Sequence, residues 1–280
     1  MTAALANKAG LGRAELDEAA LSALQRTLAT NRFLPAPPPG MHDVGDGDFR
    51  AIGAEFLGHF VRYGELRPSE TVLDIGCGLG RMAIPLTQYL QAPEGAYRGV
   101  DIVASAIAWN TDAITSVYPN FTFAHLDVQN DLYNPGGKVA SDAVTLPVAA
   151  ESCDLVTMTS VFTHLDRAAT DAYLREVRRV LRPGGRLLAT LFLIDDATRA
   201  ALKAADNRLK FDLDMGGPQY AADPAHPLAA VAFERDYFLG RAAAAGLVPR
   251  RPIVPGFWSG RASGVYQDLA VLQPKPGARP

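Results

Sequence analysis

The 280-residue sequence predicts an α/β domain with a Rossmann-like, doubly wound sheet. From Thr71 onward, short apolar segments alternate with amphipathic ones, which is typical of parallel β-α-β units with helices on both faces of a sheet. The first apolar segment runs directly into a glycine-rich turn, "VLDIGCGLGR" at 72–81, and such a turn usually holds a nucleotide. Apolar residues at 48% and charged residues at 20% are ordinary for a globular chain.

The first part of the chain predicts helices that cover the sheet. Leucines at helical spacing predict a helix at 14–29, and four prolines within 35–39 then favour a rigid connector. Asp48 is positioned to cap a second helix, which carries Phe49 and other apolar residues on one face. We therefore expect residues 1–40 to form an N-terminal helix with a Pro-rich linker, and residues 41–280 to form the main domain.

The middle of the chain is expected to supply the sheet and most of the helices packed on it. Strands are expected at 71–75, 97–102, 121–126, 153–160 and 186–193, and helices at 80–91, 104–117 and 167–181.

The last third of the chain has a different pattern. A polar segment with several Gly and Pro residues, 195–226, is expected to be a lid or substrate-binding insertion. A helix is expected at 233–245. Apolar runs at 251–254 and 265–272 follow, and we expect them to close the sheet as two antiparallel strands.

Composition and charge argue against several classes of protein. A net charge of −3 and a pI near 6.0 argue against nucleic-acid binding through a basic face. No apolar run approaches the ~18 residues of a membrane span, and the N-terminus lacks a secretory signal, so a cytoplasmic location is expected. Cys77 and Cys153 are too few for a disulfide framework or a structural zinc site, and we expect both to be reduced packing residues.

Three kinds of ligand are considered for the glycine turn: a triphosphate, a dinucleotide with a pyrophosphate, and an adenosine without phosphate. A phosphate-binding P-loop needs Lys-Ser/Thr after its last glycine, but Gly80 is followed by Arg81 and Met82. A dinucleotide fingerprint needs a small residue at the sixth position counted from Gly76, where Arg81 stands. The pattern here is D-x-G-x-G-x-G, and its acid, Asp74, suits a ligand with donors or positive charge. S-adenosylmethionine has an ammonium, a sulfonium, two ribose hydroxyls and no phosphate, and therefore fits.

Acids at the next two strand ends support this ligand. Asp101 stands 21 residues after Gly80, close to the spacing of about 20 expected for an acid that binds a ribose. Asp127 ends the third strand, where a side chain could meet the adenine amino group. Because ligands of open α/β sheets bind at the carboxyl edge, acids at three successive strand ends indicate a nucleoside site there.

The sequence resembles the class I S-adenosylmethionine-dependent methyltransferases over about residues 45–273. The resemblance rests on "VLDIGCGLG", "YRGVDIV", "FAHLDV", "CDLVTMTSVFTHL" and "EVRRVLRPGGRLLATLF", in that order. It implies a seven-stranded, mostly parallel sheet whose last strand is antiparallel. The segments "VGDGDF" and "GFWSGRASGVYQD" are similar to a bacterial subgroup that acts on small molecules or glycans.

The resemblance also assigns cofactor residues. It implies that Asp74 and the glycine turn surround the methionine end of the cofactor, that Asp101 binds the ribose, and that the residues after the second and third strands border the adenine. The full set of cofactor candidates is Asp74, Gly76, Cys77, Gly78, Gly80, Asp101, Ile102, Asp127, Val128 and Ser160. The expected product is S-adenosylhomocysteine.

His164 is the candidate general base. Methyl transfer depends largely on positioning, but a neutral hydroxyl acceptor must also lose a proton. The fourth strand ends in "TSVFTHLDR", where this fold presents groups to the methyl, and histidine titrates near neutral pH. His164 could instead cap the next helix or bond a backbone carbonyl. The segment departs from the Asn/Asp-Pro-Pro-aromatic signature of amino methylation, which argues against DNA-base methylation.

Acceptor residues are expected in the segments around the sheet edge. The candidates are Asp48, Phe49, Tyr133, Trp258, Arg261, Tyr266 and Asp268. Trp258 and Tyr266 could stack on a ring, and Arg261 and Asp268 could bond hydroxyls or a carboxylate, although Trp258 could equally close the sheet edge. A metal site would require a cluster of acidic residues near the acceptor. The sequence shows no such cluster near the fourth strand, so no metal is expected.

The sequence thus predicts an S-adenosylmethionine-dependent methyltransferase acting on a hydroxyl of a small molecule or glycan. An N-methyltransferase acting on an amine is the first alternative, because an amine needs only positioning. A non-catalytic cofactor-binding partner protein is the second. No nucleic-acid or membrane partner is expected, and the protein is expected to be a monomer or a homodimer.

Overall fold

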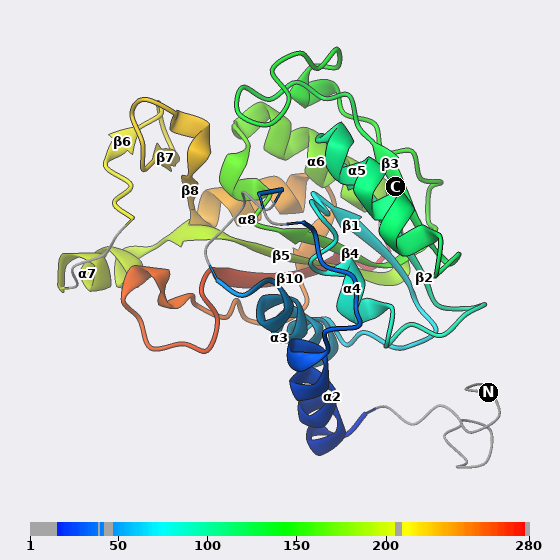
Figure 1. The fold of residues 1–280 in the computed structure, drawn as a ribbon. Coiled ribbons are helices and arrows are strands. Elements are labelled where there is room, and N and C mark those ends of the chain that lie inside the picture. Colours follow the sequence, from blue (N-terminus) through cyan, green and yellow to red (C-terminus); the bar gives the residue numbers. More distant parts are fainter. Residues whose placement is uncertain (1–15, 39, 42–46, 205–208, 278–280) are drawn as a thin grey trace.

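The computed structural model describes residues 16–38, 40–41, 47–204 and 209–277 (Figure 1). Its centre is a sheet of seven strands in the order β3-β2-β1-β4-β5-β10-β9. The first five are parallel, and β10 is antiparallel to both of its neighbours. Their bounds are Thr71–Ile75 (β1), Ala96–Asp101 (β2), Phe121–His125 (β3), Cys153–Thr159 (β4), Leu181–Ile194 (β5), Leu247–Pro249 (β9) and Asp268–Pro274 (β10). This confirms the predicted Rossmann-like α/β fold with an antiparallel last strand.

Helices cover both faces of this sheet. On one face Leu57 and Phe60 of α3 pack with Val72 and the strands beside it. On the other face Leu174 of α6 packs in a second core. The bounds are Phe49–Arg62 (α3), Ala83–Leu86 (α4) and Ala104–Asn110 (α5) on the first face, and Arg167–Val180 (α6) and Arg235–Ala244 (α8) on the second. The two buried faces explain why the central strands are apolar throughout.

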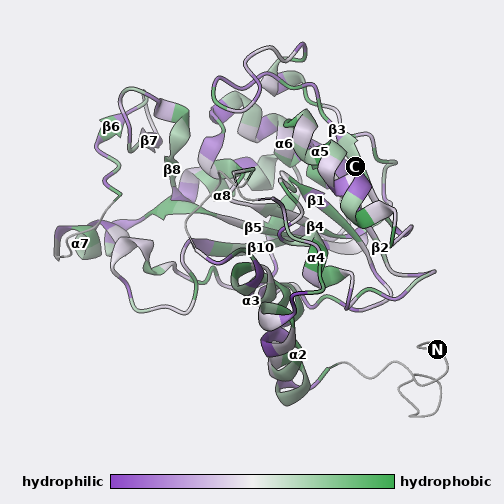
Figure 2. Cartoon of the chain, in the orientation of Figure 1, coloured by the Kyte–Doolittle hydropathy of each residue, from purple (hydrophilic) through white to green (hydrophobic). Residues whose placement is uncertain are grey.

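The N-terminal helix, α2 (Glu18–Thr30), is docked on α3 rather than on the sheet. Hydrophobic and hydrophilic residues alternate along it (Figure 2), and Leu21 and Leu28 are its buried residues. The Gln25 amide donates to the carbonyl of Ala54 at 2.8 Å, and Arg62 pairs with Glu18. The predicted helical cover is therefore present, while the division into 1–40 and 41–280 stays a prediction.

The strand β5 continues beyond this sheet and carries a small extension. Its last residues pair in parallel with β8 (Val231–Glu234), which pairs with β7 (Gln219–Ala221) and through it with β6 (Leu213–Asp214). A short helix, α7 (Asp196–Ala204), follows β5 directly. The extension lies apart from the main sheet in Figure 1. The segment expected to be a polar insertion thus adds strands to the sheet.

Two predicted helices are shorter than expected. The helix predicted at 80–91 is regular only over Ala83–Leu86, because Pro85 lacks an N–H and the Thr87 hydroxyl bonds the carbonyl of Ile84 at 2.6 Å. The helix predicted at 104–117 ends at Asn110 and continues as a π-turn, η1 (Thr111–Thr115).

Two predictions near the C-terminus were also wrong. The run at 251–254 forms only an isolated bridge from Val254 to Leu269, since Pro252 and Pro255 lack donors. The strand that pairs with β10 is β9 instead. The helix predicted from residue 233 begins at Arg235, because Phe233 belongs to β8.

Arg186 joins four parts of the fold at the amino edge of the sheet. Its buried guanidinium donates to the Glu70 carboxylate at 2.6 and 2.9 Å, to the carbonyl of Glu65 at 2.9 Å, to that of Asp154 at 3.0 Å and to that of Gly64. These bonds tie β5 to the turn after α3 and to the start of β4.

Arg186→Leu is expected to lower the free energy of unfolding by about 3 kcal/mol, because it leaves Glu70 and three carbonyls without their buried donor. Urea denaturation measures this. Arg241→Leu is the matched control: it removes an equally short pair with Asp171 that is far more exposed, and should cost no more than about 1 kcal/mol. Equal losses in the two variants would show that Arg186 has no special role.

Candidate functional site

The glycine turn lies at the carboxyl edge of the sheet, between the ends of β1 and β2. The N–H groups of Gly76 and Cys77 both donate to the carbonyl of Val100, at 2.8 and 3.1 Å. Gly76, Gly78 and Gly80 have φ angles of +76°, +50° and +74°, which disfavour any other residue. A Cβ on Gly76 would lie 2.5 Å from Val161, whereas one on Gly78 would meet nothing within 4 Å. The turn is thus packed tightly at its start and open at its middle.

Asp101 clasps this turn from the end of β2. One carboxylate oxygen accepts the N–H of Gly78 at 2.7 Å, and the other accepts the N–H of Val103 at 2.8 Å. The residue is only 8% exposed, and burial raises the pKa of its carboxyl while the backbone hydrogen bonds oppose that rise. Each oxygen accepts one backbone bond and keeps capacity for another, so the carboxylate can still bind ribose hydroxyls.

Asp74 serves the site from inside the sheet. It is 1% exposed, and its two oxygens accept the hydroxyls of Tyr97 at 2.5 Å and Thr157 at 2.7 Å. Burial raises the pKa of this carboxyl to about 6. These bonds tie the end of β1 to Tyr97 near the start of β2 and to Thr157 on β4. The carboxylate therefore supports the glycine turn, and only the backbone beside it is presented to a ligand.

The remaining cofactor candidates lie along the same edge. Cys77 is buried against Gly99, and burial raises the pKa of its thiol, which favours the neutral form. Ile102 packs partly against the core, and Val128 is buried. Asp127 is partly exposed and lies 3.8 Å from the ammonium of Lys138. Their roles in binding adenine stay predictions.

The end of β4 carries the most unusual backbone of the site. Ser160 has a φ of +62°, which non-glycine residues rarely adopt. The buried hydroxyl of Thr159, just before it, has no hydrogen-bond partner among the described residues. Buried polar atoms are normally paired, so this hydroxyl is a group that a ligand can satisfy. Thr159 is not among the site residues predicted from the sequence, although a threonine at the end of an apolar strand is a visible signal.

His164 lies in a short 3-10 turn, η3 (Phe162–His164), directly after β4. Its Nδ1 lies 3.1 Å from the carbonyl of Leu228, and its ring packs edge-to-face on Tyr133 with centroids 5.4 Å apart. Burial lowers the pKa of the imidazole. Burial also raises the pKa of the Tyr133 phenol, and the charge of Asp101 adds to that rise. The structure therefore brings His164 and Tyr133 to the edge where Asp101 lies.

Two of the predicted acceptor-binding residues, Trp258 and Asp268, are buried and make contacts within the protein instead. Trp258 is only 4% exposed, packs on Phe192 and donates to Asp268 at 2.8 Å, so it closes the sheet edge. The Asp268 carboxylate also accepts the N–H groups of Gly256 and Leu193, both at 2.8 Å. These three bonds hold the 256–258 turn against β5 and leave Asp268 a structural role.

Other candidates remain available at the surface. Tyr266 is 48% exposed and meets Phe257, itself half-exposed, with ring centroids 5.2 Å apart. Asp48 caps α3 by accepting the N–H of Ala51 at 2.7 Å, which confirms the expected cap. The neighbouring Phe49 lies under the guanidinium of Arg81, next to the glycine turn.

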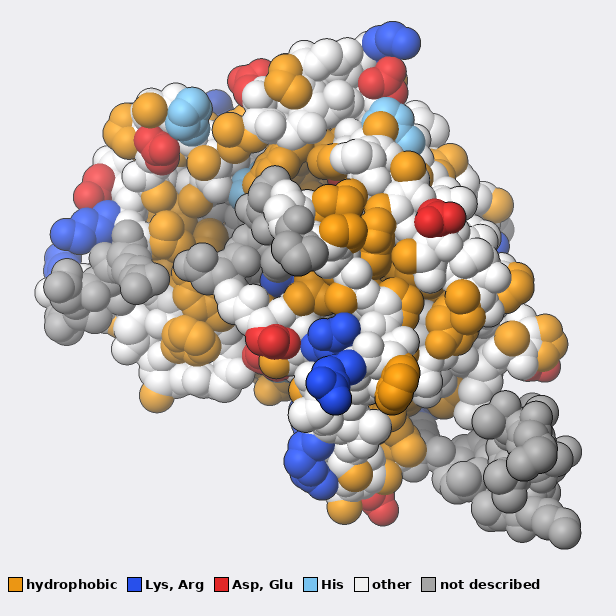
Figure 3. Space-filling model, viewed as in Figure 1, with side chains coloured by type: hydrophobic (Ala, Val, Ile, Leu, Met, Phe, Trp, Pro, Cys, Tyr) orange, Lys and Arg blue, Asp and Glu red, His pale blue; other side chains and the backbone are white. Residues whose placement is uncertain are grey.

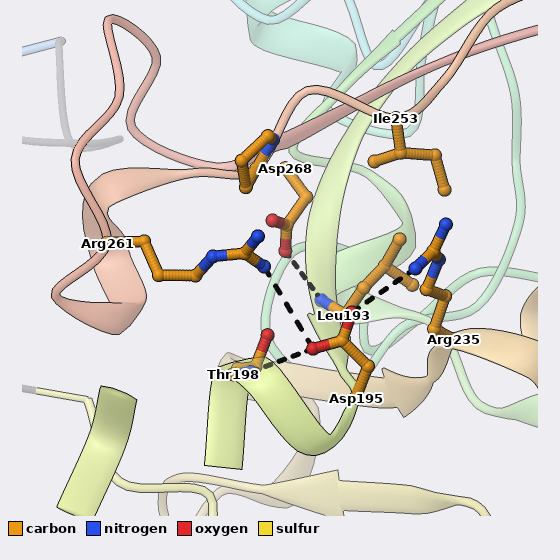
Figure 4. Close-up of a pocket in the computed structure, with 8 residues that line it drawn as sticks. Leu193, Asp195, Thr198, Arg235, Ile253, Arg261 and Asp268 are labelled. Atoms are coloured by element: carbon orange, nitrogen blue, oxygen red, sulfur yellow. Dashed lines mark hydrogen bonds and ion pairs between the residues drawn. The ribbon is translucent and has the colours of Figure 1, made fainter. Parts of the chain in front are cut away.

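A small hollow opens at the carboxyl end of β5 (Figure 4). Its volume is about 50 Å³, and Asp195 stands between the guanidinium groups of Arg235 and Arg261, 3.3 and 3.9 Å away. Thr198 and Asp268 complete its polar lining, and Ile253 belongs to its apolar wall. Two arginines and two acids leave the hollow without net formal charge.

Other kinds of site have little support in the described part of the chain. Within it, no three His, Cys, Asp or Glu residues are grouped so that they could hold a metal ion, and no helix is long and apolar enough to cross a bilayer. Lys and Arg side chains on the face in Figure 3 form only small, separated groups.

Comparisons with known proteins agree with this geometry. Residues 73–189 match the family model of a methyltransferase domain. The fold is similar to the PH0226 protein of Pyrococcus horikoshii, with a TM-score of 0.56 at 18% identity, over 85% of this chain and 96% of that one. It is also similar to an S-adenosylmethionine-dependent methyltransferase of Methanosarcina mazei, with a TM-score of 0.52 at 17% identity, over 77% and 97% of the chains. The calicheamicin-biosynthesis methyltransferase CalO1, solved with S-adenosylhomocysteine bound, has a TM-score of 0.50 at 13% identity, over 81% and 56%.

The chain therefore carries a methyltransferase domain, in a fold shared with S-adenosylmethionine-dependent methyltransferases. Its cofactor is S-adenosylmethionine, and the residues present fit it. Gly76 is exposed, the space in front of Gly78 is open, and Asp101 keeps acceptor capacity. The unpaired hydroxyl of Thr159 lies at the same edge.

The buried Asp74 predicts a distinct pH dependence of stability. Because its folded pKa, about 6, lies above its unfolded value, the folded protein keeps a proton that the unfolded chain releases. Stability is therefore lost as the pH rises from about 4 to about 6. Asp74→Asn should abolish that loss and gain about 3 kcal/mol relative to the wild type between pH 4 and pH 7. Urea unfolding at several pH values measures it, and parallel curves for the two proteins would refute it.

Proposed function

We propose that this methyltransferase acts on a hydroxyl group of a small molecule or glycan, with His164 as general base. The observation that supports this most is the position of the imidazole. Its Nδ1 faces the carbonyl of Leu228, which can only accept, so Nδ1 carries the proton and Nε2 of the neutral ring is left as an acceptor. Burial lowers the pKa of the ring, which keeps it neutral near pH 7.

This arrangement suits the chemistry of a hydroxyl acceptor. Bound S-adenosylmethionine supplies an electrophilic methyl group. A neutral hydroxyl attacks well only if its proton leaves in the transition state, and a neutral imidazole at the end of β4 can take that proton. Tyr133 packs on the ring and restricts its orientation. The carbonyl of Leu228 stabilises the imidazolium that forms, because Nδ1 keeps its hydrogen bond throughout.

The hollow at the end of β5 supports a polar but uncharged acceptor. Arg235 and Arg261 offer donors and Asp195 offers acceptor oxygens, with no net charge to select an ion. Such mixed groups suit hydroxyls. At about 50 Å³ the hollow holds one substituent rather than a whole sugar. The exposed rings of Phe257 and Tyr266 stand on the segment that also carries Arg261, where the body of an acceptor can pack.

Residues 195–226 are proposed to border this acceptor site, since Asp195 and Thr198 line the hollow. Methylation of an amine is the second candidate function. It would use the same cofactor site and would need no base, so a variant of His164 separates the two.

His164→Asn is the test, because the asparagine amide can keep the bond to Leu228 while Nε2 is lost. With hydroxyl-bearing acceptors found by a labelled-methyl screen, kcat should fall by roughly 10²- to 10⁴-fold. The dissociation constant for S-adenosylmethionine should stay within about twofold. In the wild type, kcat/KM should rise with pH through a pKa below the usual histidine value and be flat above pH 7, because only the neutral ring accepts a proton.

The matched control is His226→Asn, since His226 is exposed and only two residues from Leu228. It should leave kcat unchanged. Retention of full kcat in His164→Asn, or a screen in which only amines are methylated, would overturn the proposal for oxygen.

A further inference from the structure

Ser160 is held in its unusual conformation by side chains from two other segments. Its N–H donates to the Thr190 hydroxyl oxygen at 2.9 Å. The Thr190 hydroxyl in turn donates to the amide oxygen of Gln267 at 2.6 Å. The Gln267 amide nitrogen then donates to the Ser160 hydroxyl oxygen at 2.7 Å. The three residues form a closed circuit of hydrogen bonds across β4, β5 and the segment before β10, here called the Ser160 circuit.

The circuit acts on the glycine turn through the next residue. Since Ser160 reverses the chain at a φ of +62°, it sets the position of Val161. Val161 packs so closely on Gly76 that a Cβ there would lie 2.5 Å from its Cγ2. Serine has no intrinsic preference for this backbone conformation, so its neighbours must impose it. The contact between Val161 and the turn therefore depends on the bonds made by Ser160.

Thr163 also stabilises the conformation of Ser160. Its hydroxyl donates to the carbonyl of Ser160 at 2.7 Å, so the amide, hydroxyl and carbonyl of Ser160 are all engaged. None of these bonds comes from the glycine turn itself. The position of Val161 against the glycine turn is thus set by residues outside that turn.

We propose that Gln267 is a positioning residue for cofactor binding, acting through Ser160 and Val161 on the glycine turn. Gln267 lies between Tyr266 and Asp268, in the segment that faces the acceptor hollow. The Ser160 circuit therefore connects the segment beside the hollow, through Gln267, to the glycine turn, through Ser160 and Val161. The proposal rests on the cofactor alone and holds whether the acceptor atom is oxygen or nitrogen.

A double-mutant cycle tests this. Gln267→Met keeps the side-chain volume and removes both of its bonds in the circuit. It should raise the dissociation constant for S-adenosylhomocysteine about tenfold by calorimetry. Hydrogen exchange of the Ser160 amide in the cofactor-free protein should become faster, a readout that needs no ligand. In the Ser160→Gly background, where glycine adopts a positive φ without strain, Gln267→Met should change the dissociation constant less than twofold.

Two further variants keep the test decisive. Thr190→Val removes the acceptor for the Ser160 N–H and should weaken binding to a similar extent, which also serves if Gln267→Met fails to fold. Gln273→Met is the control, since Gln273 lies six residues further along the chain, in β10, and its amide oxygen accepts from the exposed Arg250. It should leave binding unchanged. Binding within twofold of the wild type in both Gln267→Met and Thr190→Val would overturn the proposal, as would an equal effect of Gln267→Met in both backgrounds.

Discussion

The carboxylate of Asp101 holds the glycine turn over the end of β2, and the geometry of the proposed cofactor site depends on these hydrogen bonds. By accepting the N–H groups of Gly78 and Val103, it joins the glycine turn to the segment after β2, 25 residues further along the chain. Asp74, near the end of β1 where the glycine turn begins, bonds Tyr97 of β2 and Thr157 of β4 and so ties these three strands together. The buried carboxylates are costly unless they are hydrogen-bonded, and both are.

The two sides of the site are built differently. The cofactor side consists of backbone held by buried acids, which leaves little freedom in the glycine turn. The proposed acceptor side consists of side chains from η3, the end of β5 and residues 256–268, which come together because β10 runs antiparallel and brings Asp268 back to the carboxyl edge. The antiparallel last strand is thus what would allow the C-terminal segment to take part in the proposed acceptor site.

The cofactor side was largely predictable from the sequence, because its signals are local: three glycines that need positive φ angles, and acids that follow apolar strands. The rest depended on partners distant in the chain. The orientation of His164 is set by Leu228, the conformation of Ser160 by Gln267, and the burial of Trp258 by Phe192. The strands β6 and β7 are two and three residues long, too short to show the alternation of apolar and polar residues that predicts a strand.

Calorimetric titration of S-adenosylmethionine and of NAD into the wild type and Asp101→Ala tests the central claim most directly. If Asp101 and the glycine turn bind the cofactor, the wild type should bind S-adenosylmethionine with a micromolar dissociation constant and should not bind NAD. Loss of the carboxylate should weaken binding at least about tenfold, or roughly 1.5 kcal/mol. Unchanged affinity in Asp101→Ala, or binding of NAD in place of S-adenosylmethionine, would contradict this account of the glycine turn.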